Sequence, residues 1–269
     1  MKILNGSELA GYIKERQAKQ VRGLRQANDI FPKLAIVQCK DDPIINTYVR
    51  LKKTYGADID VDVVDYLVSQ EEVANLLQEL NDDDSVHGII VQLPLTDTSQ
   101  TDEIINMVLP AKDVDALGSQ AIFDPATPMA ILWLLNGYNV ELRGKKILLI
   151  GRGKLVGAPL EQMLRSSNYE VEVVDREVED LPGHTIEADI IVTATGSPAI
   201  LYPDMIKEKA VVVDAGVASE SGKTVGDLHE SVYERDDLTI TPVKGGVGPL
   251  TVCALFDNVI RAARMRVDE

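Results

Sequence analysis

The stretch Lys146-Ile-Leu-Leu-Ile-Gly-Arg-Gly-Lys-Leu-Val-Gly157 decides the fold of the second half of the chain. Its apolar run predicts a buried strand, and the amphipathic residues Ala158–Arg165 beyond the glycines predict a helix. Glycines at such a turn let the backbone approach a pyrophosphate, and the first N–H groups of the helix receive its charge. The turn therefore favours a dinucleotide site. Its GxGxxxG spacing differs from the common GxGxxG, so a plain tight turn is the alternative interpretation.

Apolar, β-rich runs recur on both sides of this turn and alternate with helical spacing, which is typical of parallel strands joined by crossover helices. The predicted strands are Leu34–Gln38, Ile59–Val64, Gly88–Gln92, Lys146–Ile150, Glu170–Val174, Asp189–Thr193 and Ala210–Asp214. The predicted helices are Ile45–Tyr55, Glu71–Leu80, Met129–Leu135, Ala158–Arg165 and Leu250–Met265.

This order of elements predicts an α/β fold with two domains, an N-terminal βαβ-type catalytic domain and a C-terminal Rossmann-like dinucleotide-binding domain. We expect the last helix, Leu250–Met265, to pack back on the first domain. The expected domains are therefore residues 1–118 with 252–269, and residues 119–251.

The composition is that of a soluble globular protein, with 45% hydrophobic and 26% charged residues among 269. A formal net charge of -16 argues against nucleic acid, which is bound through clustered Lys and Arg. The chain shows no apolar run of membrane-spanning length and no signal-peptide pattern, so we expect no membrane partner and a cytoplasmic location. Cys39 and Cys253 have no CxxC spacing, so neither a disulfide framework nor a metal site is predicted.

The predicted strand after the glycine turn ends in Val173-Val-Asp-Arg176, where a dinucleotide fold contacts the adenosine ribose. An acidic residue such as Asp175 binds the ribose hydroxyls of NAD, whereas an arginine such as Arg176 can pair with the 2′-phosphate of NADP. Arg152 is a second guanidinium in the same region, and both groups could also be solvated turn residues. We predict NADP as the cofactor and do not exclude NAD.

Lys52 is placed unusually for a lysine. If Ile45–Tyr55 is a helix, then Ile45, Tyr48, Val49, Leu51 and Tyr55 fall on one side and Lys52 lies among them. Loss of hydration disfavours the charged form of an amine, so such a lysine can transfer protons near neutral pH. The alternative is a lysine whose stem covers apolar surface while its amine reaches water.

Two other segments add polar groups near the predicted carboxyl ends of strands, where open α/β sheets place their sites. Gln92 ends the run Gly88–Gln92, and Pro110-Ala-Lys-Asp-Val-Asp115 brings two carboxylates into one loop. Each has a structural alternative, as a strand-terminal amide or as turn-forming aspartates.

Five motifs follow one another along the chain: Tyr48-Val-Arg-Leu-Lys52, Gly88-Ile-Ile-Val-Gln-Leu-Pro-Leu95, Lys112-Asp-Val-Asp115, Gly151-Arg-Gly-Lys-Leu-Val-Gly-Ala-Pro159 and Gly245-Gly-Val-Gly-Pro-Leu-Thr251. Together they resemble the bifunctional methylenetetrahydrofolate dehydrogenase/cyclohydrolase family, called FolD in bacteria, over nearly the whole chain. Asp214-Ala-Gly-Val217 and Val225-Gly-Asp227 also resemble the family's second-domain signature.

The resemblance implies that 5,10-methylenetetrahydrofolate is oxidised with NADP and that the 5,10-methenyl product is hydrolysed to 10-formyltetrahydrofolate. It also implies a homodimer formed through the nucleotide domain. By motif, Lys52 matches the catalytic lysine, Tyr48 its aromatic neighbour against the folate, Gln92 the partner of the lysine and Asp115 the carboxylate that holds the pterin.

The residues expected at the site fall into two sets. The substrate-binding set is Tyr48, Lys52, Val91, Gln92, Leu93, Asp115, Gly245, Gly246, Pro249 and Thr251. The cofactor-binding set is Gly151, Arg152, Gly153, Val156, Gly157, Asp175, Arg176, Thr195, Gly196, Gly216 and Val217.

The chain departs from the family pattern at several positions that flank these sets. Ile45 stands where the family has serine, Ala116 where it has glycine, Ala126 where it has cysteine, Gly153 where it has serine and Lys244 where it has proline. These departures keep two rivals open: another two-domain dehydrogenase of the shikimate or amino-acid type, and a non-catalytic paralogue that binds nucleotide or folate.

Overall fold

The computed structural model describes residues 1–220 and 223–267, and its contacts divide the chain into two compact units. The six-stranded unit, named after its sheet, contains Met1–Ala10 and Thr127–Thr251. The three-stranded unit contains Gly11–Ala126 and Val252–Glu269. Residues 1–10 and 119–126 therefore lie on the other side of this division from the one expected from the sequence.

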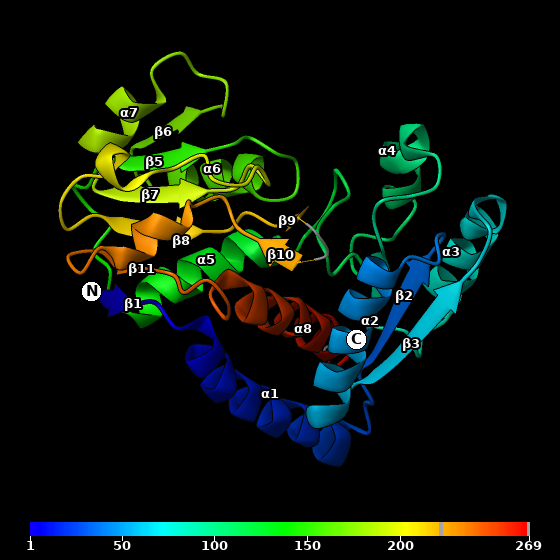
Figure 1. Cartoon of the computed structure of the whole chain (residues 1–269). Coiled ribbons are helices and arrows are strands. Elements are labelled where there is room, and N and C mark those ends of the chain that lie inside the picture. The colour runs from blue at the N-terminus through cyan, green and yellow to red at the C-terminus, as the bar shows by residue number, and fades with distance from the viewer. Residues whose placement is uncertain (221–222, 268–269) are drawn as a thin grey trace. The chain divides into compact units, whose positions relative to one another are not determined.

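The sheet of the six-stranded unit is wholly parallel, and Figure 1 shows its strands running from β6 at one edge to β1 at the other. Along the chain its strands are β1 (Lys2–Ile3), β5 (Ile147–Ile150), β6 (Val171–Val174), β7 (Ile190–Thr193), β8 (Val211–Asp214) and β11 (Thr239–Ile240). Strand β5 lies between β6 and β7, so the direction of winding reverses between β5 and β7. In doubly wound sheets this reversal is where ligands bind.

The helices of this unit are α5 (Ala126–Gly137), α6 (Gly157–Ser166) and α7 (Leu181–Glu187), and a hairpin of β9 (Ala218–Glu220) and β10 (Lys223–Val225) stands apart from the main sheet. The strands and helices predicted around the glycine turn are confirmed to within a residue or two. The predictions lacked α7, β9, β10 and the two short strands β1 and β11, in which Lys2 and Ile3 pair with Thr239 and Ile240. A strand of two residues has no readable alternation, so it could not be found from the sequence.

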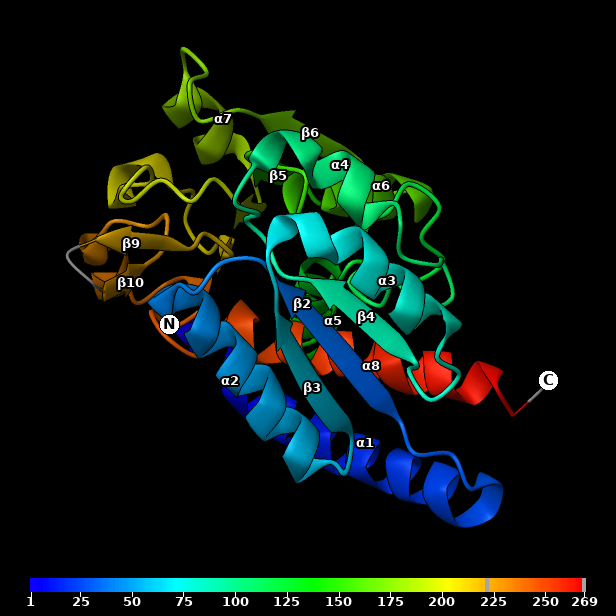
Figure 2. The same ribbon diagram turned by 90° about the vertical axis from the view of Figure 1, so that its right-hand side faces the viewer.

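The three-stranded unit contains a parallel sheet in the order β3, β2, β4, as Figure 2 shows. Its elements are α1 (Gly6–Asn28), β2 (Lys33–Gln38), α2 (Pro43–Asp58), β3 (Asp62–Leu67), α3 (Val73–Asp82), β4 (Gly88–Val91), α4 (Thr101–Ile105) and α8 (Val247–Met265). Helices α1 and α8 also carry residues of the other unit at their first turns. None of the helices in residues 1–220 and 223–267 is long and apolar enough to span a membrane.

In this half of the chain one predicted strand needs correction, and helix α1 was missed. The strand expected at Ile59–Val64 begins three residues later, at Asp62, because Ile59 ends α2 and Asp60 makes the turn with φ 64°. Helix α1 was not predicted at all. Its buried positions include Gln17, and a polar residue in the stripe conceals the helical period.

The two faces of the three-stranded sheet are covered by different helices. Ala35 and Val37 of β2 and Ile89 and Val91 of β4 share one core cluster with the buried side chains of α3. Because side chains alternate along a strand, Leu34, Ile36 and Gln38 of β2 point to the opposite face. On β3 that face carries Asp65, which pairs with Lys53 of α2.

Helix α8 is joined to the three-stranded unit by amide side chains. Asn258 Nδ2 donates to the carbonyls of Val114 and Asp124, both at 2.9 Å. Gln17 Nε2 of α1 donates to the Cys253 carbonyl at 2.8 Å. The return of the last helix to the first half of the chain therefore rests on buried hydrogen bonds as well as on apolar packing.

Lys112 closes the carboxyl end of α3 from within the core. Its Nζ donates to the carbonyls of Leu80, Asn81 and Asp83 at 2.9, 2.7 and 2.8 Å, and burial lowers its pKa. The last carbonyls of a helix need such donors because no further turn supplies them.

We predict that Lys112→Met destabilises the protein by about 2–4 kcal/mol, since three carbonyls lose their charged donor. The exposed Lys40 provides the control, and Lys40→Met should stay within about 0.5 kcal/mol of the parent. Urea unfolding followed by circular dichroism measures both. Equal midpoints for the two variants would contradict the role of Lys112.

Candidate active site

Helix α2 carries the central side chain of the candidate site. Asp42 caps the helix, accepting from the backbone N–H groups of Ile44 at 2.8 Å and Ile45 at 3.2 Å. The buried positions of the helix are Ile45, Val49 and Gly56. Lys52 lies in the same stripe, three residues after Val49 and four before Gly56. The predicted position of Lys52 on an apolar face is therefore observed.

The residues beside this buried stripe are more exposed than predicted. Leu51 was expected on the apolar side but is 51% exposed, because it lies a quarter-turn away from Lys52. Tyr48, one turn before Lys52, is 40% exposed. Its ring is therefore accessible to a ligand, while the side chain at position 52 faces inward.

Lys52 Nζ donates to Gln92 Oε1 at 2.8 Å. Gln92 directly follows β4, its backbone N–H donates to the Val37 carbonyl at 2.8 Å, and its Nε2 donates to the Leu93 carbonyl at 3.2 Å. The amide is thus oriented so that its oxygen faces the lysine. The pKa of Lys52 is lowered by burial, and the negative charge of Asp115 opposes part of that shift.

The loop containing Asp113 and Asp115 runs alongside β4. Ile89 N–H donates to the Lys112 carbonyl at 2.7 Å, and Asp113 forms an isolated parallel bridge with Ile89. Burial raises the pKa of Asp115, and the nearby Lys52 lowers it. Lys52, Gln92 and Asp115, three of the residues predicted to be catalytic, therefore come together in one unit.

Asp113 is a site-supporting residue whose role the sequence did not reveal. Its carboxylate accepts from Gly118 N–H at 2.8 Å and from Leu117 N–H at 3.4 Å. Burial raises the pKa of Asp113, and these backbone donors lower it. Ala116 has a φ of 56°, a conformation in which glycine is free of strain and alanine is not. Asp113 and this left-handed residue together shape the turn that presents Asp115.

The other residues expected to bind the substrate differ in burial and in the elements to which they belong. Val91 is only 4% exposed and its side chain belongs to the α3-facing core, whereas Leu93 is partly buried beyond the strand end. Gly245 has a φ of 83°, and its carbonyl accepts from Ser7 N–H at 2.9 Å. The predicted loop from Gly245 to Thr251 is shorter than expected, because α8 begins at Val247 and includes both Pro249 and Thr251.

The expected cofactor residues follow four neighbouring strands of the six-stranded sheet, β5, β6, β7 and β8, at their carboxyl ends. Gly151 has a φ of 97°, and a Cβ added there would lie 2.7 Å from the Ala194 carbonyl oxygen after β7. A Cβ added at Gly157 would lie 2.0 Å from the Gly151 carbonyl oxygen. Both glycines are required by close packing, whereas a Cβ at Gly153 would meet nothing within 4 Å. The turn thus leaves open space at its middle glycine.

Two aspartates, the buried Asp227 and the partly buried Asp214, hold the loops at this edge. Asp227 accepts from Thr195 N–H at 2.8 Å and from Ser197 N–H at 3.0 Å. Asp214 accepts from Gly216 N–H at 2.9 Å and from Asp227 N–H at 3.1 Å, and burial raises its pKa. Both lie in stretches that resemble a family signature, yet only the structure shows that they position the backbone of other expected residues.

The two candidate arginines differ in their contacts. Arg176 Nη1 donates to Ser197 Oγ at 2.7 Å, which places its guanidinium between the ends of β6 and β7. Arg152 Nε donates to Glu161 Oε2 at 2.8 Å, and the same carboxylate also accepts from Arg165. Arg176 pairs with Glu177, whose side chain is 83% exposed, whereas Arg152 pairs with Glu161, whose side chain is 12% exposed.

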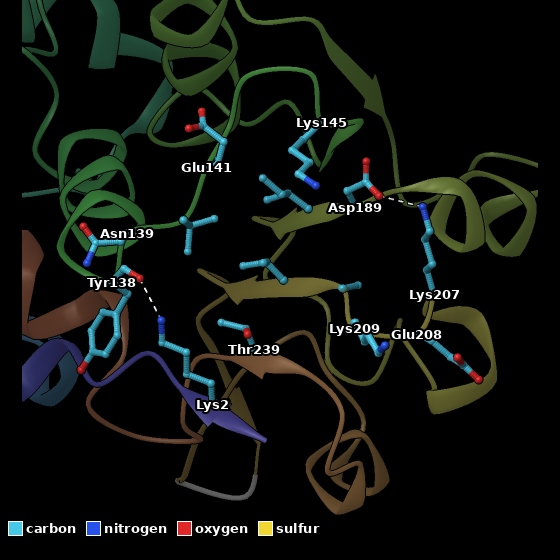
Figure 3. Close-up of a pocket in the computed structure, with 14 residues that line it drawn as sticks. Lys2, Tyr138, Asn139, Glu141, Lys145, Asp189, Lys207, Glu208, Lys209 and Thr239 are labelled. Atoms are coloured by element: carbon cyan, nitrogen blue, oxygen red, sulfur yellow. Dashed lines mark hydrogen bonds and ion pairs between the residues drawn. The ribbon is translucent and has the colours of Figure 1, made fainter.

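A cavity of about 360 Å³ lies at the opposite, amino-terminal edge of this sheet (Figure 3). Lys2, Lys145, Lys207 and Lys209 line it, with Lys207 paired to Asp189 at 2.7 Å. None of the residues predicted for the site lines this cavity. The candidate site is therefore defined by strand ends and by Lys52, not by this cavity.

Comparison with known proteins gives a consistent result over the whole chain. Residues 4–115 match the catalytic domain of the tetrahydrofolate dehydrogenase/cyclohydrolase family, and residues 125–267 match its NAD(P)-binding domain. The chain is 36% identical to the bifunctional protein FolD of Bacillus subtilis over 276 residues, 97% of each chain.

Solved structures agree in fold. A crystal structure of the bifunctional FolD enzyme from Campylobacter jejuni aligns with a TM-score of 0.92 at 35% identity, covering 99% of each chain. The Trypanosoma brucei FolD enzyme, complexed with NADP cofactor and inhibitor, aligns with a TM-score of 0.93 at 28% identity, covering 99% of this chain and 98% of that one. The predicted two-domain α/β fold is confirmed.

The rival interpretations gain no support from these comparisons. The likeness to shikimate 5-dehydrogenase from Listeria monocytogenes has a TM-score of 0.54 at 13% identity, covers 89% of this chain and 97% of that one, and is a likeness of fold alone.

We predict that Gly157→Ala destabilises the protein by about 2 kcal/mol or more, because the new methyl collides with backbone rather than with a flexible side chain. Gly153→Ala, in the same turn, is the matched control and should leave the melting temperature within about 2 °C of the parent. Differential scanning calorimetry compares the three proteins. A Gly157→Ala melting temperature equal to the parent's would refute the packing argument.

Proposed function

The chain belongs to the tetrahydrofolate dehydrogenase/cyclohydrolase family, and we propose that Lys52 is the group that moves protons in its hydrolytic reaction. The protein is an NAD(P)-dependent enzyme that oxidises 5,10-methylenetetrahydrofolate to the 5,10-methenyl form and hydrolyses that product to 10-formyltetrahydrofolate. The observation that carries the role of Lys52 is its hydrogen bond to Gln92 from within the buried stripe of α2.

The amine of Lys52 is suited to take and return a proton. Because burial lowers its pKa, the neutral amine is present at a lower pH than in a lysine surrounded by water. A neutral amine can accept a proton from the water that attacks the methenyl carbon, and the resulting ammonium can later return it. Gln92 Oε1, 2.8 Å from Nζ, keeps the amine in one place during this exchange.

Asp115 and Tyr48 are proposed to hold the folate. A carboxylate accepts hydrogen bonds from the ring N–H groups of a pterin, and the loop geometry set by Asp113 fixes where Asp115 stands. The exposed ring of Tyr48 offers a flat apolar surface beside Lys52. Val91, Gln92 and Leu93, at the end of β4, and the segment from Gly245 to Thr251 remain proposed substrate-binding residues.

The six-stranded unit fits a dinucleotide. The open space at Gly153 and the close backbone approach at Gly151 leave room for a pyrophosphate at the start of α6. The nicotinamide, when bound, accepts the hydride. We propose that the remaining contacts come from Val156, Gly157, Asp175, Thr195, Gly196, Gly216 and Val217.

NADP is the cofactor that this edge favours. Arg176 has its guanidinium next to Ser197 and is not committed to a buried carboxylate, so it can pair with a 2′-phosphate. Arg152 already shares Glu161 with Arg165, which leaves it less available.

A homodimer and a cytoplasmic location complete the proposal. Strand β6 is at the edge of its sheet, so one row of its backbone groups is free to face a second copy. Neither Cys39 nor Cys253 forms a disulfide within the described residues, as is usual for reducing compartments.

We predict that Lys52→Met lowers cyclohydrolase turnover by at least about 100-fold, the usual contribution of a proton-transfer group, while NADP binding persists. Lys53→Met is the matched control, since this neighbour pairs with Asp65 at the surface, and its turnover should equal the parent's. The measurements are the decay of methenyltetrahydrofolate absorbance and titration with NADP. Unchanged hydrolysis in Lys52→Met would refute the assignment.

We predict that Arg176→Ala reduces the NADP over NAD preference of the dehydrogenase by at least about tenfold, because a bidentate phosphate contact is lost. Arg152→Ala should change this ratio much less. Initial rates of methenyl formation with each cofactor provide the ratio. A larger loss in Arg152→Ala than in Arg176→Ala would assign the phosphate to Arg152 instead.

A further inference from the structure

Gln38, the last residue of β2, contains a buried oxygen without a partner. The side chain is 4% exposed, and its Oε1 accepts no hydrogen bond from the described part of the chain. An interior carbonyl oxygen left in this state lowers stability by about 1–3 kcal/mol, so most such atoms are paired. An apolar side chain at this position would avoid that cost. We therefore expect the Gln38 amide to have a function that is not evident from the hydrogen bonds in the structure.

The register of the sheet places the residue Gln38 beside Gln92. Val37 is the Cα partner of Val91 in the parallel pairing of β2 with β4, so the next residues, Gln38 and Gln92, are also level with each other. Adjacent strands are about 4.8 Å apart. Val37 and Val91 both point into the α3-facing core, so Gln38 and Gln92 both point to the α2 face, where Lys52 lies.

A donor for this oxygen can come from the protein itself. Gln38 Oε1 is enclosed, so bulk solvent does not reach it. A long, flexible donor on this face is Lys52 Nζ, which is bonded to Gln92 Oε1. An ammonium has three N–H groups, and a single amide oxygen satisfies only one of them.

We propose that Gln38 is a positioning residue whose Oε1 receives the ammonium of Lys52 when the lysine carries the proton of the hydrolytic reaction. In this proposal the neutral amine keeps the bond to Gln92 that the structure contains, and the protonated form is shared between the two amides. The proposal rests on the role of Lys52 proposed above. Gln38 would hold the proton-bearing state without adding a negative charge that would trap the proton on the lysine.

Charged groups on the neighbouring elements also influence the pKa of Lys52 or are neutralised by their own partners. Asp115 is the carboxylate whose charge acts on the lysine, and Asp113 acts on Asp115 in turn. Asp65 on β3 is paired with Lys53, and Asp257 on α8 is paired with Arg16. The amide of Gln38 adds an uncharged acceptor to this set from β2.

The decisive variant is Gln38→Met, which keeps the size of the side chain and removes the acceptor. Loss of an acceptor for the ammonium lowers the pKa of Lys52, so the rise of cyclohydrolase kcat with pH should move about one unit lower. On the plateau above this rise, kcat should fall about tenfold because the proton-bearing state loses an acceptor, and KM should stay unchanged because Gln38 does not touch the substrate. Gln38→Glu replaces the acceptor by a carboxylate and should move the same pH profile upward.

Gln20 on α1 provides the matched control, because its Oε1 is also buried and accepts no hydrogen bond within the described residues. Gln20→Met makes the same chemical change on a helix instead of at the end of β2 and should leave kcat, KM and the pH profile equal to the parent's. A heteronuclear NMR titration of the Lys52 amine, assigned with Lys52→Met, reports the same pKa shift in the folded variants without any turnover.

The outcomes separate this proposal from the proposed function. If the parent hydrolyses methenyltetrahydrofolate and Gln38→Met matches it in kcat and in Lys52 pKa, the role of Gln38 is refuted and that of Lys52 stands. If Lys52→Met retains hydrolysis, the role of Lys52 fails, and the NMR titration still decides whether Gln38 acts on the lysine. If Gln38→Met does not fold, an unshifted profile in Gln38→Glu refutes the proposal.

Discussion

The hydrogen bond between Lys52 and Gln92 is the interaction on which the catalytic half of the protein depends. A lysine amine can lie in an apolar stripe only if acceptors stand within about 3 Å of it, since an uncompensated buried ammonium is too costly. The parallel pairing of β2 with β4 places the acceptor Gln92 on the sheet. The Asp42 cap and the buried Ile45 and Val49 fix the position of α2, which carries the lysine. The pairing of β2 with β4 and the rotation of α2 about its axis must therefore both be correct for Lys52 to reach its acceptor and transfer protons.

The sequence revealed this arrangement wherever the signal was local. Continuous apolar runs predicted β4 and β5, and a helical period with one misplaced charge predicted the inward position of Lys52. The glycine turn was found for the same reason, because strand, glycines and helix follow one another within a short segment. The resemblance of five ordered motifs then connected Lys52 to Gln92, forty residues away, which periodicity alone could not do.

The features that could not be predicted from the sequence depend on contacts with residues far away along the chain. Leu51 looked apolar and inward, but the three-residue step from Val49 to Lys52 sets the buried stripe and leaves it outside. Helix α1 was hidden because its stripe contains Gln17, which is polar and fully buried through its bond to Cys253. Asp113 could be read as a turn former and Asp227 only as part of a family signature, because their backbone donors Gly118 and Ser197 lie five and thirty residues away.

The same geometry explains why the departures from the family pattern leave the site intact. Gly153 replaces a serine where an added Cβ meets only open space, so either residue fits the turn. Ala116 replaces a glycine at a φ of 56°, which strains the backbone but keeps the carboxylate of Asp113 bonded to the next N–H groups. Ile45 replaces a serine at a position that is 5% exposed, so it adds apolar contact under α2 without entering the Lys52–Gln92 bond. The changes at Ala116 and Ile45 alter strain and packing, and the polar contacts that place the proton-transfer group are retained, which is why these substitutions are compatible with a working enzyme.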